Sequence, residues 1–244
     1  MNVKDLVKRA ISTTGYQVVN LRARRDSFQQ QAWLLNRQET SPTTILDLGA
    51  NVGQTNRRYR EHFPDAMIHS FEPFPAAFAE LSALTSRDPK TKVHQLAASD
   101  VRGVRTFYTS VGSQMNSLLK VTPGGETYMG GVAAAVTGSI EVNTTTIDAF
   151  CSEYGIEEID ILKMDIQGGE LAALRGAARM LQSRAIRLIY TEVLFAEMYQ
   201  GAAPFDVLWR HLESAGYQLE GLYNLANGSN DMLGYGDAIF LIAR

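Results

Sequence analysis

The sequence predicts an α/β fold built on a mostly parallel, Rossmann-like sheet, and three observations carry this prediction. From Thr43 onward, short apolar runs alternate with amphipathic segments, as strands joined by helical crossovers do. Polar residues follow several of these runs, at the strand ends where open α/β sheets bind ligands. The last two apolar runs are joined by a loop too short for a helical crossover, so we expect them to pair antiparallel at the sheet edge.

The predicted elements follow in order along the chain. The parallel strands are expected at 44–48, 67–72, 92–97, 159–164 and 186–192, and the antiparallel pair at 216–223 and 237–242. The first crossover helix is expected over 54–63, because Pro64 stops it. The next helix begins with Pro75, a residue that helix starts favour, and runs to about residue 87.

Two segments fall outside this alternation. Residues 1–40 are predicted to form a helical extension, and residues 41–244 the α/β domain. Within that domain, residues 101–147 are expected to form an insertion with a β-hairpin, because 104–108 and 139–143 alternate in polarity around a glycine-rich loop. The extension is basic and precedes the first strand. We expect it to pack on the domain, either as a lid or as the surface of a homo-oligomer.

The composition is that of one globular domain. The chain has 244 residues, 45% of them hydrophobic, and a formal net charge of -3. It can therefore bury a full core, and its charge favours neither nucleic acid nor an anionic membrane surface. No apolar stretch reaches the roughly 18 residues of a membrane span. The single cysteine, Cys151, cannot form an intrachain disulfide, which predicts a reducing, cytoplasmic setting.

A glycine turn directly follows the first predicted strand. It begins with Asp47 and Gly49 and ends with Gly53, in the pattern Asp-x-Gly-x-x-x-Gly. Glycine lets the backbone approach a ligand at a strand-to-helix turn. A carboxylate at the tip of the next strand, here Glu72, can bind both hydroxyls of a ribose. The turn therefore predicts a nucleotide-type cofactor.

Asn51 indicates which cofactor this is. It takes the place of the middle glycine in the Gly-x-Gly-x-x-Gly pattern, which admits a dinucleotide pyrophosphate. S-adenosylmethionine has no pyrophosphate; its ribose needs an acidic partner, and N–H groups at a helix N-terminus can hold its carboxylate. The alternative is an NAD(P)-dependent oxidoreductase, which Glu72 would serve equally. Asn51 and the lack of a Tyr-x-x-x-Lys pattern disfavour it.

Six motifs occur in the order found in a known family. They are Ile45 to Thr55, Phe71 to Pro75, Ala97 to Asp100 followed by Gly103, Thr145 to Asp148, Lys163 to Glu170, and Glu192. Over most of its length the chain resembles the FkbM-type methyltransferases. The resemblance implies the class I methyltransferase sheet and S-adenosylmethionine-dependent O-methylation of a sugar, glycan or natural product. A non-catalytic relative that binds cofactor or a partner through the N-terminal helices is the other alternative.

Three residues near strand ends are the predicted catalytic residues. Methyl transfer is an in-line displacement, and a base should remove the proton of the acceptor hydroxyl. Asp165 is the first candidate for the base and Glu192 the second, while Lys163 either pairs with these acids or binds the acceptor. Asp165, Glu170 and Glu192 could instead hold Mg²⁺. Because Gln167 stands where the family usually has glutamate, no metal is predicted.

The predicted cofactor site gathers residues from the ends of the first four strands. Asp47 is expected to face the methionyl ammonium or to hold the turn, and Ser99 and Asp100 to meet the adenine. The full predicted set is Asp47, Gly49, Asn51, Gly53, Gln54, Thr55, Glu72, Pro73, Ser99, Asp100 and Asp165.

Overall fold

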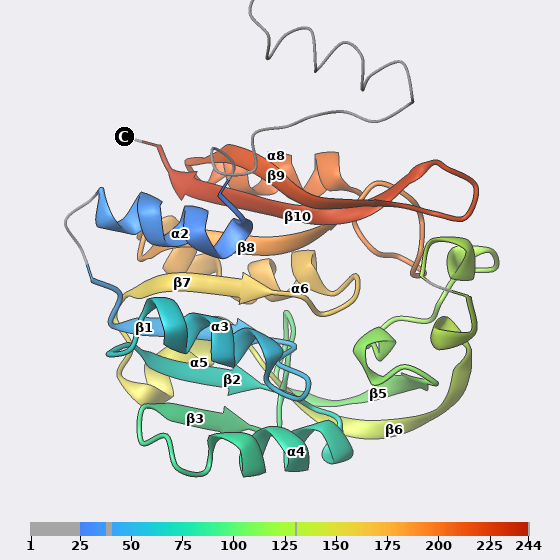
Figure 1. Cartoon of the computed structure of the whole chain (residues 1–244), viewed down its shortest axis with the longest axis horizontal. Helices are drawn as coiled ribbons and strands as arrows, with labels where there is room; N and C mark the ends of the chain where they lie inside the picture. The colour runs from blue at the N-terminus through green and yellow to red at the C-terminus, as the bar shows by residue number, and fades with distance from the viewer. Residues whose placement is uncertain (1–24, 38–40, 130, 244) are drawn as a thin grey trace, which may run out of the picture.

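The computed structural model describes residues 25–37, 41–129 and 131–243. Its main sheet consists of β1 (Thr44–Leu48), β2 (Met67–Phe71), β3 (Thr91–His94), β7 (Ile159–Met164), β8 (Ile186–Leu194), β9 (Tyr217–Asn227) and β10 (Leu233–Ile242). These seven strands lie in the order β3-β2-β1-β7-β8-β10-β9 (Figure 1). β10 is antiparallel to both of its neighbours, and the pairs from β3 to β8 are parallel. The predicted mostly parallel sheet with a reversed C-terminal strand is confirmed.

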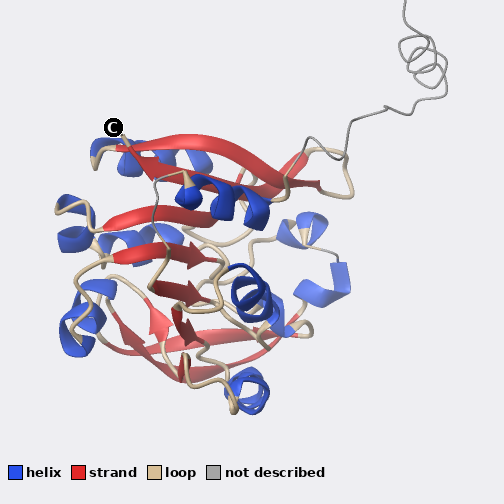
Figure 2. Cartoon of the chain, turned by 60° about the vertical axis from the view of Figure 1, so that its left-hand side comes forward, coloured by secondary structure: helices blue, strands red, loops and turns tan. Residues whose placement is uncertain are grey.

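Helices cover both faces of this sheet (Figures 1 and 2). α2 (Ser27–Asn36) and α3 (Gln54–His62) lie on one face, and α5 (Ile147–Tyr154), α6 (Glu170–Arg175), α7 (Ala178–Gln182) and α8 (Phe205–Ser214) pack on the other. α4 (Pro75–Thr85) lies beside β3. Because side chains alternate along a strand, Ile161 of β7 joins the core under α2 and α3, while Leu162 joins the opposite core. None of the helices within the described ranges is long and apolar enough to cross a membrane.

The predicted third strand is divided in the structure. β3 ends at His94, and β4 (Ala97–Ala98) pairs with β6 (Val136–Thr145) in a separate sheet. The Leu96 N–H donates to the carbonyl of His94 at 2.9 Å, and this tight turn leads the chain out of the main sheet. The single strand predicted over 92–97 is therefore wrong, because pairing with a distant strand outweighs the continuous local pattern.

The second sheet has the order β4-β6-β5. β5 (Gly103–Ser110) and β6 pair antiparallel, as their alternating polarity predicts. Between them lie three short 3-10 helices, η2 (Ser113–Met115), η3 (Gly125–Tyr128) and η4 (Gly131–Ala134). Figure 1 shows this whole unit beyond the arrowheads of β1, β2 and β7, at the carboxyl edge of the main sheet. The insertion thus stands where ligands bind in open α/β sheets.

The described part of the predicted N-terminal extension is α2. Asp26 caps this helix: its carboxylate accepts the N–H groups of Phe28 and Gln29, and Gln29 reaches back to the Asp26 N–H. Phe28 and Leu35 pack into the core on this face of the sheet. The predicted helix before residue 25 lies outside the described residues, and association through the N-terminal helices stays a prediction.

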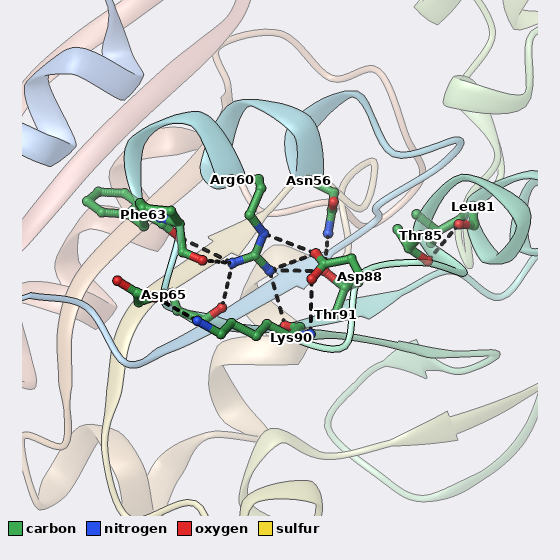
Figure 3. A network of polar contacts seen from close by, with 11 residues as sticks. Asn56, Arg60, Phe63, Asp65, Leu81, Thr85, Asp88, Lys90 and Thr91 are labelled. Atoms are coloured by element: carbon green, nitrogen blue, oxygen red, sulfur yellow. Dashed lines mark hydrogen bonds and ion pairs between the residues drawn. The ribbon is translucent and has the colours of Figure 1, made fainter.

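A network of hydrogen bonds and an ion pair around Arg60 fixes the turn from α3 to β2 (Figure 3). The Arg60 guanidinium donates to the carbonyls of Phe63, Pro64, Ala66 and Lys90 and pairs with Asp88 at 2.9 Å. Three of these carbonyls lie in the turn after His62, the last residue of α3, and the fourth lies just before β3. Arg60 therefore satisfies these groups and ties α3 to the segment that leads into β3.

Candidate functional site

The turn after β1 is held close to the neighbouring strand ends. The N–H groups of Gly49 and Ala50 both donate to the carbonyl of Phe71, at 3.1 and 2.9 Å. Gly49 has a φ of 77°, and a Cβ there would lie 1.9 Å from the carbonyl oxygen of Asp165. Glycine is required at this position because the loop after β7 passes so close.

Gly53 serves the packing of helices. It has a φ of 95°, and a Cβ there would lie 2.5 Å from a methyl group of Leu84 on α4. Asn51 adopts a φ of 47°, a conformation that asparagine tolerates better than most residues. The glycines of this turn are therefore explained by close packing against the loop after β7 and against α4, as well as by the space that a ligand needs.

Glu72 lies at the tip of β2 and is held by the backbone. One carboxylate oxygen accepts the N–H of Asn51 at 2.9 Å, and the other accepts the N–H of Phe74 at 2.8 Å. Burial raises the pKa of Glu72, against these hydrogen bonds, which lower it. Each carboxylate oxygen has a second lone pair, so Glu72 can still accept two hydroxyl donors.

A cavity of about 280 Å³ lies against the turn and Glu72. One part of its wall is apolar, with Phe71, Leu96 and Phe107. Other lining residues are polar, among them Asn51, Lys163 and Asp165. The full lining is Gly49, Ala50, Asn51, Gln54, Thr55, Phe71, Glu72, Pro73, Leu96, Ala97, Ala98, Phe107, Ser113, Gln114, Asn116, Leu118, Lys163, Asp165, Ile166, Gln167 and Gly169.

Lys163 is occupied beneath the turn. Its Nζ lies 3.0 Å from Asp47 Oδ1 and donates to the carbonyl of Gly49 at 3.0 Å and to that of Leu48 at 3.3 Å. Burial lowers the pKa of Lys163, but Asp47 and Asp165 outweigh that effect and raise it overall. Burial raises the pKa of Asp47, with Lys163 opposing it. Lys163 therefore holds the β1 turn, and its ammonium has no donor free for a substrate.

Asp165 belongs to a carboxylate cluster that also contains Asp47, Glu170 and Glu192. It is the most exposed of the four, with 47% of its side chain accessible to solvent. Gln167 Nε2 donates to Asp165 Oδ1 at 2.8 Å and to Glu192 Oε2 at 3.3 Å. The hydroxyl of Tyr199 donates to Gln167 Oε1. Asp165 and Glu192, predicted from separate strands, are thus joined through one side chain.

Glu192 and Glu170 are buried carboxyl groups in the same region. Burial raises the pKa of Glu192 well above its ordinary value, and the nearby charges of Asp165, Glu170 and Asp237 add to this effect. Burial also raises the pKa of Glu170 to about 7. Its carboxylate accepts the N–H of Ile166 at 2.9 Å, so Glu170 holds the turn into α6. Among the described residues, no group of three or more His, Cys, Asp or Glu is arranged to hold a metal ion.

The structure gathers most of the predicted site residues around one cavity, and leaves others outside its lining. Those that line it are Gly49, Asn51, Gln54, Thr55, Glu72, Pro73, Lys163 and Asp165. Asp47, Gly53 and Glu192 are not among the lining residues: Asp47 pairs with Lys163, Gly53 packs against α4, and Glu192 accepts a hydrogen bond from Gln167. Ser99 and Asp100 follow β4 in the second sheet, where Asp100 pairs with Arg105 at 3.0 Å. Leu96 and Ala97 line the cavity in their stead.

The insertion supplies wall residues that no motif identified. Ser113, Gln114, Asn116 and Leu118 all line the cavity. Ser113 Oγ donates to Asn51 Oδ1 at 3.3 Å, which joins this segment to the β1 turn. The sequence indicated only that an insertion follows the third strand; it did not indicate which residues of the insertion line the cavity.

The fold is Rossmann-like, with a cavity at the carboxyl edge of its sheet, and comparison with known proteins gives the family. The model of the methyltransferase FkbM domain matches residues 47–219, so the chain belongs to the FkbM methyltransferase family. The 2-O-methyltransferase NoeI of Sinorhizobium fredii (strain NBRC 101917 / NGR234) is 30% identical over 176 residues, which are 70% of this chain and 71% of that protein.

Two further comparisons find a second relative and a solved structure that are similar to this chain. The 31-O-demethyl-FK506 methyltransferase FkbM of Streptomyces tacrolimicus is 30% identical over 172 residues, which are 62% of this chain and 66% of that protein. A solved rRNA methylase from Streptococcus thermophilus has 9% identity and a TM-score of 0.47, over 90% of this chain and 98% of that one.

Proposed function

We propose that the chain is an S-adenosylmethionine-dependent O-methyltransferase that acts on a hydroxyl of a sugar, glycan or natural product. The observation that carries this proposal is the position of Glu72 in a cavity that apolar side chains and the polar residues after β1 and β7 also line. Membership of the FkbM methyltransferase family supports it independently and favours it over a nicotinamide-dependent oxidoreductase.

The cavity wall has the chemistry that the three parts of S-adenosylmethionine require. Phe71, Leu96 and Phe107 form an apolar surface for the adenine. Glu72 can accept both ribose hydroxyls, because each of its oxygens keeps a lone pair after binding one backbone N–H. The methionine part would lie along the turn from Gly49, with α3 beginning beside it.

Asp165 is the residue we assign as the base. When bound, S-adenosylmethionine supplies a methyl group that is already activated by the sulfonium, so the acceptor oxygen needs only alignment and removal of its proton. Asp165 lines the cavity and is accessible, and the amide of Gln167 orients it. The ammonium of Lys163 lies 3.9 Å from Asp165 Oδ2.

Glu192 is suited to a different role. Burial raises its pKa well above the ordinary value, which makes it a poor base, and Gln167 Nε2 donates to it at 3.3 Å, so Glu192 can fix the amide that orients Asp165. The proposed acceptor class is supported by the names of relatives that methylate oxygen atoms.

Isothermal titration calorimetry with S-adenosylmethionine, S-adenosylhomocysteine and NAD tests the cofactor. We expect both adenosyl ligands to bind and NAD not to bind. If neither adenosyl ligand binds at about millimolar concentration, where even a weak cofactor complex forms, the proposal is wrong. The matched variants Asp165→Asn and Glu61→Gln separate binding from chemistry: the first should keep cofactor affinity and lose turnover, and the second, on exposed α3 surface, should keep both.

A further inference from the structure

Gln167 occupies a constrained position at the centre of the carboxylate cluster. Its side chain is buried, and its φ of 56° lies in the left-handed region that non-glycine residues seldom adopt. The buried hydroxyl of Ser117 donates to the Gln167 carbonyl at 2.7 Å and holds that conformation. Such backbone strain persists only where surrounding contacts impose it.

The orientation of the Gln167 amide follows from its partners. Tyr199 is fully buried, and its hydroxyl donates to Oε1. Nε2 faces Asp165 and Glu192 and has two hydrogens, one for each carboxyl group. The reversed amide would bring its oxygen against two acids, which repel it unless both are protonated. The observed orientation is therefore the one that satisfies all three partners.

We propose that the Gln167 carboxamide is a positioning residue that joins Asp165 and Glu192 in the place where a divalent cation would otherwise bridge them. The amide brings the two carboxyl groups together through hydrogen bonds and adds no charge. This inference relies on the proposed function for the roles of Asp165 and Glu192, but the contacts that carry it do not involve a cofactor.

The proposal has a consequence for a single substitution. Gln167→Glu keeps the size of the side chain and turns the amide into a third carboxylate beside two others. Three oxygen ligands of this kind favour Mg²⁺ or Mn²⁺. The variant should therefore gain a cation site that the natural chain lacks. We call the two hydrogen bonds from the Gln167 amide to Asp165 and Glu192 the clamp. Gln167→Met, of similar size and without charge, should lose the clamp and gain no cation site.

Thermal unfolding with and without MnCl₂ tests this directly, in the full chain and without S-adenosylmethionine. We expect 10 mM Mn²⁺ to raise the Tm of the Gln167→Glu variant by at least about 3 °C, because a ligand that binds the folded state stabilises it. The Tm of the natural chain and of Gln167→Met should not rise. Gln200→Glu, which adds the same charge at an exposed neighbour of Tyr199, controls for nonspecific binding and should behave as the natural chain does.

Two results would overturn the proposal: a Gln167→Glu variant that is indifferent to Mn²⁺, or a natural chain that is stabilised to the same extent. If the variant fails to fold, nuclear magnetic resonance on the natural chain decides. The two Gln167 side-chain amide protons, assigned by their loss in Gln167→Met, should be shifted downfield and exchange slowly. Resonances at the positions of free glutamine side chains would contradict the clamp. Because no assay uses cofactor, a chain that binds no S-adenosylmethionine can still show the clamp.

Discussion

The ammonium of Lys163 lies 3.0 Å from Oδ1 of Asp47, with 4% of the lysine side chain and none of the aspartate side chain exposed. Beyond this contact, neither Asp47 oxygen has a hydrogen bond of good geometry. The pair lies directly under the β1 turn, and Lys163 also holds two carbonyls of that turn. The buried charge of Asp47 is therefore stabilised by that of Lys163, and the reverse.

Removing one member of this pair should be costly. Lys163→Met leaves the buried Asp47 carboxylate without its counterion, and we expect a loss of about 3 to 5 kcal/mol in the free energy of unfolding. The double variant Asp47→Leu with Lys163→Met should lose less than Lys163→Met alone, because no unpaired charge remains. Urea denaturation measures both. A double variant that is less stable than the single one would contradict this account of the pair.

Glu72 is predicted to determine cofactor affinity. In Glu72→Gln, one of the two oxygens becomes an NH₂ group, which faces a backbone N–H and can no longer accept a ribose hydroxyl. We expect the Kd for S-adenosylhomocysteine to rise at least tenfold, which is about 1.4 kcal/mol. Calorimetry measures it, with circular dichroism as the check that the variant folds. An unchanged Kd would remove Glu72 from the cofactor site.

The His69 and His94 rings predict how stability depends on pH. Their facing nitrogens lie 3.1 Å apart among aromatic side chains. The pKa of each ring is lowered from 6.5 to about 4, mainly by burial; the charge of Lys92 contributes to both shifts and the proximity of His94 to that of His69. The unfolded chain therefore binds more protons between these values, and stability is lost as the pH falls from 6.5 to about 4.

The pH dependence can be assigned by substitution. The decrease in Tm between pH 7 and pH 5 should become smaller in His69→Gln, because one of the two depressed pKa values is removed. His62→Gln, on the surface side of α3, serves as control and should keep the full decrease. If Tm decreases equally in the natural chain and in both variants, groups other than His69 cause the loss of stability at acid pH.

Arg60 is predicted to stabilise the α3 end through the shape of its guanidinium. Arg60→Lys keeps the charge, but a single ammonium cannot reach all the carbonyls that the planar fork contacts. We expect the free energy of unfolding to fall by about 1 to 3 kcal/mol, because several partly buried carbonyls lose a hydrogen-bond donor. Arg57→Lys, exposed on the same helix, should change stability little. Chemical denaturation compares the two, and equal effects would contradict the network.

The parts of the site that could be predicted from sequence are those set by local order. Asp165 follows an apolar strand and Glu72 follows another, so their meeting at one sheet edge follows from parallel pairing alone. The left-handed turn at Gly49 is marked by the glycine itself. These features need no knowledge of distant contacts.

The rest depended on contacts between distant segments. The departure of β4 from the main sheet depends on its pairing with β6, and it moved Ser99 and Asp100 away from the cavity lining. The contribution of Ser113 depends on its bond to Asn51, 62 residues away. The polar segment around Ser113 has no pattern that predicts such a contact. The orientation of the Gln167 amide likewise depends on the hydroxyl of Tyr199, which lies 32 residues away in the sequence.

The central claim is that the cavity at the β1 turn holds S-adenosylmethionine with its reactive end toward Asp165. A crystal structure of the chain with S-adenosylhomocysteine tests this most directly. Our account predicts ribose hydroxyls within hydrogen-bond distance of Glu72, adenine against Phe71 and Leu96, and the sulfur on the side of Asp165. A ligand bound elsewhere, or one whose sulfur faces away from Asp165 while its ribose lies far from Glu72, would contradict it.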